Sequence, residues 1–402
     1  MNTVNAGDTA WVLSATCLVL MMTVPGLALF YAGLVRKKNV LSTMMQSFAA
    51  CCLVTLLWIA LGYTLAFSGT GLWSGDLAKV FLLGVNKDSV TGTIPEPLFM
   101  TFQMTFAIIT PAVICGAFAD RMKFSALLLF LGAWSLIVYA PVAHWIWGGG
   151  FLAQWGVLDF AGGTVVEINS GVAGLVAALM LGRRRGYPEE PMPPHNLILS
   201  VAGAGLLWVG WLGFNGGSAL AANATAAVAL TNTQIAGAAG ALAWLAAEWK
   251  IHNRPSVLGI ISGAVGGLVA ITPACAFVSP GGALAIGIAA GLACFYVSTS
   301  VKRRFGYDDS LDVFGVHVIG GIVGMLGIGL FAAKDWGGAS GLFEGNASLL
   351  GIQALGSLIV AAWCAVASFA ILKAIDATIG LRVTRETEIE GLDLNLHGEV
   401  VP

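Results

Sequence analysis

Residues 159–174 read DFAGGTVVEINSGVAG, and residues 309–324 read DSLDVFGVHVIGGIVG. Each stretch holds an aspartate, an ionisable residue and two glycines at successive spacings of 8, 4 and 3 residues: Asp159, Glu167, Gly171 and Gly174 in the first copy, and Asp309, His317, Gly321 and Gly324 in the second. The offset between matching positions is 150 residues throughout. This internal repeat predicts two related halves, each with one ionisable residue in a largely apolar segment.

The composition of the whole chain is that of a membrane protein. Of 402 residues, 57% are hydrophobic and only 10% are charged, whereas an average globular protein devotes about a quarter of its residues to charge. The 53 glycines suit apolar helices, because small residues let helices approach closely in lipid. The net charge of -2 provides no basic field for nucleic acid, so nucleic-acid binding is excluded.

The apolar stretches predict eleven transmembrane helices, since a bilayer core of about 30 Å needs roughly 20 apolar residues per helix. The predicted fold class is therefore an all-α membrane protein. The eleven spans are residues 9–35, 40–67, 97–119, 124–147, 161–181, 196–215, 227–249, 256–272, 281–300, 313–333 and 349–374.

Basic residues predict the orientation of these spans, because they cluster in every second connector. Sixteen of the nineteen lie there: Arg36, Lys37, Lys38, Arg121, Lys123, Arg183, Arg184, Arg185, Lys250, Arg254, Lys302, Arg303, Arg304, Lys373, Arg382 and Arg385. By the positive-inside rule, the N-terminus is outside and the C-terminus is inside. We expect a membrane domain over residues 1–374, with repeat halves at about 9–181 and 196–333 and a last span at 349–374. Residues 375–402 would form a charged cytoplasmic tail.

The two copies of the repeat are predicted to run in opposite directions, because the second copy follows the first by five spans, an odd number. Glu167 and His317 each lie eight residues beyond an aspartate, roughly 12 Å along a helix. They therefore approach the midplane from opposite faces and could meet there. Such intramembrane ionisable residues favour a functional site. A buried hydrogen bond that merely pins two helices stays an alternative.

The aspartates near the starts of these spans allow a structural interpretation as well. Asp159, Asp309 and Asp312 could cap helices by accepting hydrogen bonds from free backbone N–H groups.

Aromatic residues gather towards the outer ends of three predicted spans. Phe102 and Phe106 share one helical face, and Trp147 ends the fourth span. Trp211 and Phe214 precede Ser218 at the end of the sixth. Rings with a hydroxyl at one end of a bundle suit a small cation, which ring faces attract. Plain packing of these rings is the alternative.

Several longer motifs are spread along the chain: FYAGLVRKKN at 30–39, FQMTFAIITPA at 102–112, IWGGGFLAQWGVLDFAGGTVV at 146–166, WVGWLGFNGGSA at 208–219, ITPAC at 271–275, DVFGVH at 312–317 and GLDLNLHGE at 391–399. These motifs resemble the Amt/Mep/Rh ammonium transporter family, and the tail resembles its bacterial Amt branch. The resemblance covers essentially the whole chain. It implies a multi-pass protein of the cell inner (plasma) membrane, a homotrimer with one narrow pore per subunit, and transport of ammonium.

The resemblance also implies roles for the aromatic residues. Phe106, Trp147 and Ser218 would recruit ammonium at the outer end. Phe106 and Phe214 would stack as a gate below that site. The vestibule would be lined by Phe102 and Trp211, and Asp159 would support the fold and bias the field towards cations.

One position departs from the family pattern. The pore of the family normally carries two histidines that share a hydrogen bond, and Glu167 stands at the first of these positions, with His317 at the second. Some members, notably fungal transporters, look similar in carrying an acidic residue there. The pair could relay the proton that ammonium must lose, and its titration would belong to both groups.

Other functions stay less favoured. An ammonium sensor of the same fold, with little flux, is the alternative function. No H-E-x-x-H or G-x-S-x-G motif indicates an enzyme, and we expect no cofactor and no metal. The resemblance implies a PII-type regulatory protein at the cytoplasmic face, and it leaves open whether methylammonium is accepted.

Overall fold

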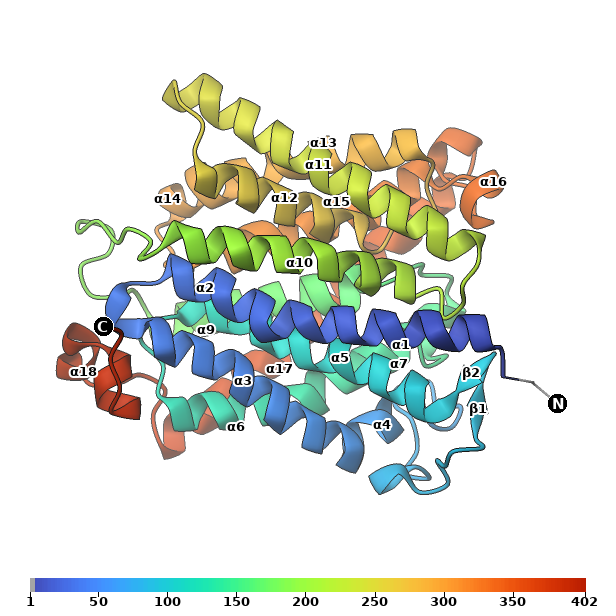
Figure 1. Cartoon of the computed structure of the whole chain (residues 1–402), viewed down its shortest axis with the longest axis horizontal. Helices are drawn as coiled ribbons and strands as arrows, with labels where there is room; N and C mark the ends of the chain where they lie inside the picture. The colour runs from blue at the N-terminus through green and yellow to red at the C-terminus, as the bar shows by residue number, and fades with distance from the viewer. Residues whose placement is uncertain (1–3) are drawn as a thin grey trace.

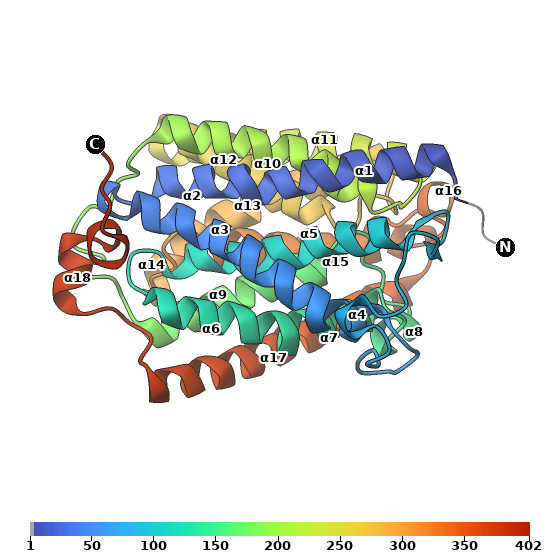
Figure 2. The same ribbon diagram turned by 60° about the horizontal axis from the view of Figure 1, so that its bottom comes forward.

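Long apolar runs form long helices in the computed structural model, which describes residues 4–402 (Figure 1). The first three residues of the predicted membrane domain lie outside the described residues. In Figures 1 and 2 the helices run along one long axis, and the two chain termini lie at opposite ends of the bundle. We call these the N-terminal end and the C-terminal end.

Nine helical segments of residues 4–402 are long and apolar enough to cross a bilayer: Ala6–Leu34, Lys37–Phe67, Glu96–Phe118, Phe124–Gln154, Gly163–Leu181, Leu197–Gly217, Pro280–Phe305, Phe314–Phe331 and Ala347–Thr378. The predicted seventh and eighth spans are also helical. Helix α11 (Ala224–His252) is less apolar because it is rich in Ala and carries three Thr, one Asn and one Gln, and α12 (Val257–Ile271) is shorter, at 15 residues.

The first half of the chain contains α1 (Ala6–Met21), α2 (Ala28–Leu34), α3 (Val40–Leu57), α4 (Tyr63–Phe67), α5 (Glu96–Ile114), α6 (Phe124–Trp134), α7 (Ala140–Ile146), α8 (Phe151–Gln154) and α9 (Asn169–Leu181). The only two strands of the described chain form a hairpin before α5: β1 (Val90–Thr91) and β2 (Ile94–Pro95), with Val90 opposite Pro95. This hairpin lies near the N-terminal end of the bundle (Figure 1).

The second half contains α10 (Leu197–Gly217), α11, α12, α13 (Pro280–Tyr296), α14 (Lys302–Phe305), α15 (Ile319–Phe331), α16 (Lys334–Gly337), α17 (Ala347–Thr378) and α18 (Arg385–Glu390). Five of these helices begin at polar N-caps whose side chains accept backbone hydrogen bonds: Asn196, Asn223, Ser256, Ser279 and Thr384. Such caps satisfy N–H groups that a helix start leaves free. Helix α17 ends at Thr378, four residues beyond the predicted end of the last span.

The two copies of the repeat have matching local structures and pack against each other. The π-helical turn η7 (Gly163–Ile168) leads into α9, and the π-helical turn η9 (Phe314–Val318) leads into α15. A Cβ atom on Gly171 would lie 2.5 Å from Val318 Cγ2, and one on Gly321 would lie 2.9 Å from the Gly163 carbonyl oxygen. Only glycine permits such an approach, so these glycines bring the two turns together.

The tail folds back onto the C-terminal end of the bundle (Figure 2). Asp393 accepts hydrogen bonds from the N–H groups of Leu41 (3.0 Å) and Ser42 (2.7 Å) at the start of α3. The Asn39 side chain in turn accepts one from Leu392 N–H, at 2.8 Å. These contacts join the tail to the connector between α2 and α3.

Buried charges also join the two halves at this end. Arg184 donates to Asp308, with Nη2 2.8 Å from Oδ1, and both side chains are buried. Fully buried Arg121 lies 4.0 Å from the same carboxylate. Burial opposes ionisation of Asp308, but the hydrogen bonds and charge of Arg184 outweigh it and hold the pKa of Asp308 below its usual value.

Candidate functional site

A cavity of about 300 Å³ lies near the N-terminal end of the bundle. It adjoins the end of α10, where Gly216 accepts a hydrogen bond from Trp11 of α1. Its walls are mostly aromatic or aliphatic and consist of Phe67, Phe99, Gln103, Phe106, Ile146, Trp147, Phe160, Ser218 and Leu220. We call it the N-end cavity. It brings together the three residues predicted to recruit ammonium: Phe106, Trp147 and Ser218.

Hydrogen bonds fix the polar atoms of two of these residues. Trp147 Nε1 donates to the carbonyl oxygen of Asp159, at 2.8 Å. Ser218 Oγ donates to the carbonyl oxygen of Phe214, at 2.9 Å, so its lone pairs remain available as acceptors. The Trp147 ring stands edge-on to Phe106, with centroids 5.8 Å apart. Two aromatic rings and one hydroxyl oxygen therefore line the same space.

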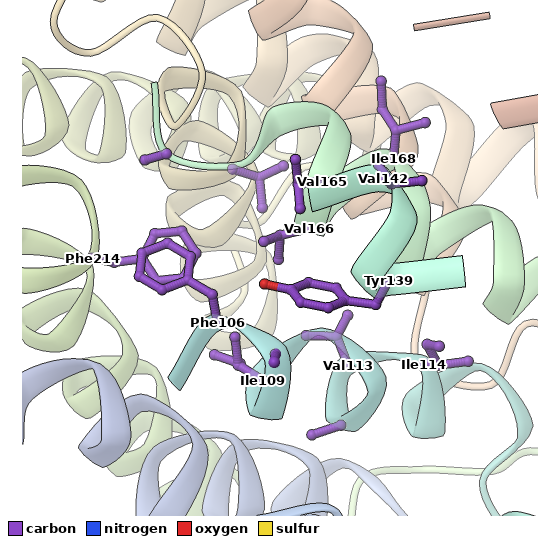
Figure 3. Close-up of a cluster of buried hydrophobic side chains, with 14 of the residues drawn as sticks. Phe106, Ile109, Val113, Ile114, Tyr139, Val142, Val165, Val166, Ile168 and Phe214 are labelled. Atoms are coloured by element: carbon purple, nitrogen blue, oxygen red, sulfur yellow. The ribbon is translucent and has the colours of Figure 1, made fainter. Parts of the chain in front are cut away.

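Two stacked phenyl rings close the inner side of this cavity. Phe106 and Phe214 have centroids 4.1 Å apart and planes inclined by 27°, and both rings are buried. Figure 3 shows the two rings face to face. Phe106 lines the N-end cavity, whereas Phe214 lines a second cavity beyond it. The stacked pair therefore separates the two spaces.

The second space, the central cavity, has a volume of about 20 Å³, enough for roughly one water-sized molecule. Its lining is largely apolar: Met22, Leu27, Phe30, Tyr31, Ile109, Val113, Val166, Glu167, Leu207, Trp211, Phe214, Val265 and His317. An ion that entered this space would lose most of its hydration, which is costly.

The Glu167 and His317 side chains meet at the wall of the central cavity. Glu167 Oε2 and His317 Nδ1 are 2.6 Å apart, and the side chains are only 2% and 9% exposed. Each residue belongs to one of the two π-helical turns, η7 and η9. The contact expected from the repeat is therefore present.

A third cavity, of about 310 Å³, opens towards the C-terminal end. It shares His317 with the central cavity and is also lined by Glu248, His252, Arg303 and Asp312. The three cavities thus follow one another along the bundle axis. The stacked Phe106 and Phe214 rings separate the N-end cavity from the central cavity. The Glu167–His317 pair adjoins the junction between the central cavity and the third cavity.

Asp159 caps the turn that carries Glu167. Its carboxylate accepts hydrogen bonds from the N–H groups of Gly162, Gly163 and Thr164 at 2.7–2.8 Å, and from Thr164 Oγ1 at 2.5 Å. The capping interpretation is confirmed for this residue. Because its carbonyl also holds Trp147, one residue positions both the N-end cavity and the start of η7.

The two matching aspartates of the second copy differ from each other. Asp309 Oδ2 accepts from Phe314 N–H at 2.7 Å, so it also acts as a cap. Burial raises the pKa of Asp309 to about 6. Asp312 has a positive φ of 59° and pairs with Lys302 at 2.7 Å, so its carboxylate forms an ion pair instead of a cap.

The resemblance implies a vestibule lined by Phe102 and Trp211, but neither residue is among those that line the N-end cavity. Phe102 is fully buried behind Phe106, with centroids 5.0 Å apart, and does not line the N-end cavity as described. Trp211 lines the central cavity instead, and its Nε1 donates to Thr272 Oγ1 at 2.7 Å.

Sequence reasoning missed other walls of the N-end cavity. Phe99, Gln103 and Phe106 share one face of α5 at spacings of four and three, and Phe67 and Phe160 complete the walls. The helical spacing from Phe106 was the available signal for Phe99 and Gln103.

Comparisons with known proteins agree with this arrangement. A model of the Ammonium Transporter Family matches residues 10–401. The chain is 49% identical over 397 residues to an ammonium transporter of Bacillus subtilis, covering 98% of both chains. It is 50% identical over 400 residues to an ammonium transporter of Aquifex aeolicus, covering 98% of this chain and 93% of that one. The crystal structure of Saccharomyces cerevisiae Mep2 superposes with a TM-score of 0.89 at 32% identity, covering 96% of this chain and 89% of Mep2.

Proposed function

Since this chain belongs to the ammonium transporter family and is a multi-pass protein of the plasma membrane, we propose that ammonium is recruited in the N-end cavity, loses a proton and crosses the central cavity as ammonia. The observation that carries this mechanism is the series of three cavities, interrupted by the stacked Phe106 and Phe214 rings and flanked by the Glu167–His317 pair.

The proposed architecture has eleven transmembrane helices in two inverted five-helix halves plus a final helix. The membrane domain covers residues 1–374 and the cytoplasmic tail residues 375–402. The basic connectors support an external N-terminal end and a cytoplasmic C-terminal end. The N-end cavity would then face the outside.

Recruitment would rely on ring faces and one hydroxyl. The faces of Phe106 and Trp147 attract a cation by about 0.5–2 kcal/mol each. Ser218 Oγ donates its own hydrogen to the carbonyl oxygen of Phe214, so it can accept a hydrogen bond from an N–H group of ammonium. Such a site would concentrate ammonium at the gate.

The gate and the central cavity would then select the neutral species. A space of about 20 Å³ with apolar walls penalises any ion through lost hydration, whereas ammonia is neutral and fits. Potassium resembles ammonium in charge and size but has no proton to lose. Deprotonation therefore provides the selectivity that ring faces alone do not.

Glu167 and His317 would accept and pass on the released proton. A carboxylate and an imidazole 2.6 Å apart can exchange one proton with little movement. Depending on which group holds it, the pair is an ion pair or a neutral acid and base. In its neutral form the pair adds no net charge to an apolar pore.

The acidic residues around the pore would have supporting roles. Asp159 orients η7 and Trp147, and its charge favours cations near the N-end cavity. Asp309 orients η9. Asp312, paired with Lys302, adjoins the exit towards the C-terminal end.

The proposed assembly is a homotrimer with one pore per subunit, in the lipid bilayer. A PII-type regulatory protein at the cytoplasmic face is the proposed partner, and methylammonium is a candidate second substrate. The chain would perform no catalysis and need no cofactor.

The experiment is flux into liposomes that contain the purified protein. Ammonium should drive saturable uptake, with changes in internal pH and membrane current recorded together, whereas potassium should produce almost no response. Equal responses to both ions would contradict the selective mechanism. Ammonium binding with no measurable flux would favour the sensor.

A further inference from the structure

We propose that the side-chain amide of Gln103 is a second hydrogen-bond acceptor for ammonium in the N-end cavity and sets the affinity of recruitment. This inference rests on the proposed function and adds to the site a residue outside the Phe106, Trp147 and Ser218 set.

Gln103 occupies the middle of the helix face that lines the cavity. Along α5, Phe99 precedes it by four residues and Phe106 follows it by three, and all three line the same space. The adjacent Phe102 points away from the cavity, into the core. Gln103 thus places one amide between two rings, where an apolar residue would complete the packing.

The cavity offers few other acceptors. Apart from Gln103, the only residue lining this cavity that has a side-chain oxygen atom is Ser218. The Trp147 N–H group donates to the Asp159 carbonyl oxygen, so Trp147 offers the cavity only its aromatic ring. Ammonium has four N–H donors, and the cavity side chains supply just two groups that could accept from them.

The amide oxygen of Gln103 is buried and, among residues 4–402, has no hydrogen-bond partner. A buried acceptor without a partner costs about 1–3 kcal/mol. Rotation of the amide by about 180° exchanges its oxygen and nitrogen with nearly the same shape, so either atom can face the cavity that Gln103 lines. A small N–H cation in the cavity would satisfy the acceptor and be held by it.

Ser218 and Gln103 come from different helices, α10 and α5, and line the same cavity as the Phe106 and Trp147 rings. A ligand held by both acceptors would be oriented as well as attracted. Ring faces attract any small cation, whereas two directional acceptors favour one that donates N–H groups.

The test compares two substitutions at Gln103 with one at a matched glutamine. Gln103→Leu removes the acceptor and keeps the approximate size, whereas Gln103→Glu retains an acceptor oxygen. Gln46 in α3 is the control, because its buried amide oxygen also has no partner among residues 4–402 and it lines none of the three cavities. Ammonium flux into liposomes is measured over a range of concentrations for each variant.

We expect Gln103→Leu to raise the half-saturating ammonium concentration about tenfold, with the maximal flux unchanged. Gln103→Glu should keep half-saturation within about threefold of the wild type, and Gln46→Leu should leave it unchanged. If Gln103→Leu cannot be reconstituted, Gln103→Met replaces it and is judged in the same way.

Two results would overturn the proposal. The first is a half-saturating ammonium concentration in Gln103→Leu, or in Gln103→Met if that variant replaces it, that equals the wild-type value. The second is an equal loss of ammonium affinity in the Leu and Glu variants, which would indicate that Gln103 only packs. Failure of the proposed function would look different, because the wild-type protein itself would then show no ammonium flux.

Discussion

His317 Nδ1 lies 2.6 Å from Glu167 Oε2, although the two residues are 150 positions apart in the chain. Each comes from a π-helical turn that continues into a helix, and glycines one turn further on let the two segments cross closely. Single π-helical turns are often found at functional sites. The two copies of the repeat therefore bring one carboxyl group and one imidazole into direct contact.

Glu167→Gln should lower proton-coupled ammonium flux at least tenfold while leaving the protein folded. Glutamine has nearly the same shape but cannot accept the proton. Glu167→His should restore flux with a shifted pH profile, because an imidazole titrates nearer neutrality than a carboxyl group. Internal pH and current in liposomes, recorded between about pH 5 and 8, measure both effects.

His317→Ala should be more damaging than Glu167→Gln, because it leaves a buried carboxylate without its partner. Size-exclusion profiles of all three variants serve as the folding control. If Glu167→Gln conducts with an unchanged pH profile and unchanged selectivity, Glu167 only pins two helices and the proton relay must be abandoned.

Trp147→Leu should raise the half-saturating ammonium concentration about threefold to thirtyfold, in line with the loss of about 0.5–2 kcal/mol of cation attraction. The ring is only partly buried, so the fold should tolerate the change. Concentration-dependent flux, measured beside the yield of intact oligomer, checks this. Unchanged affinity in a protein whose oligomer falls apart would make Trp147 a packing residue.

The sequence was sufficient for the parts of the site that depend on the repeat. Equal spacings in two inverted segments predict the meeting of Glu167 and His317, because spacing along a helix translates directly into depth. The close approach at Gly171 and Gly321 follows from the same pattern.

The side on which an aromatic residue faces was harder to predict. In helices that are apolar all round, no polar face indicates which side meets a cavity. Phe102 packs behind Phe106, and Trp211 lines the central cavity beyond the stacked Phe106 and Phe214 rings. The partner of Arg184 was equally hidden, because Asp308 is 124 residues further along the chain.

Asp159→Asn should lower both stability and flux. An amide offers one acceptor oxygen where the carboxylate now serves three backbone N–H groups and the Thr164 hydroxyl. Hydrogen bonds to a charged acceptor contribute about 1.5–3 kcal/mol each, so a loss of about 2 kcal/mol is expected. Thermal unfolding in detergent and ammonium flux measure the two effects. Unchanged unfolding with weakened ammonium affinity would instead indicate a purely electrostatic role.

Asp308→Asn should destabilise the protein by about 3 kcal/mol near neutral pH, because it leaves the buried guanidinium of Arg184 with only the more distant carboxylate of Asp120, at 3.8 Å. The thermal unfolding midpoint in detergent should fall accordingly, while a substitution at exposed Asp88, which pairs only with its neighbour Lys87 in the described chain, should leave it unchanged.

The pH dependence of unfolding tests whether the Arg184–Asp308 ion pair is the cause of this loss of stability. Arg184 holds the pKa of Asp308 below its ordinary value despite the opposing effect of burial, so the folded state binds fewer protons at this group than the unfolded state. The stabilisation is therefore fully present above the unfolded pKa of about 3.9 and is lost as the pH falls through the lower folded pKa. The difference in unfolding midpoint between wild type and Asp308→Asn should shrink below about pH 4, because protonation then makes the wild-type side chain neutral as well. A difference that stays constant from pH 7 to pH 3 would show that the charge of Asp308 does not stabilise this end of the bundle.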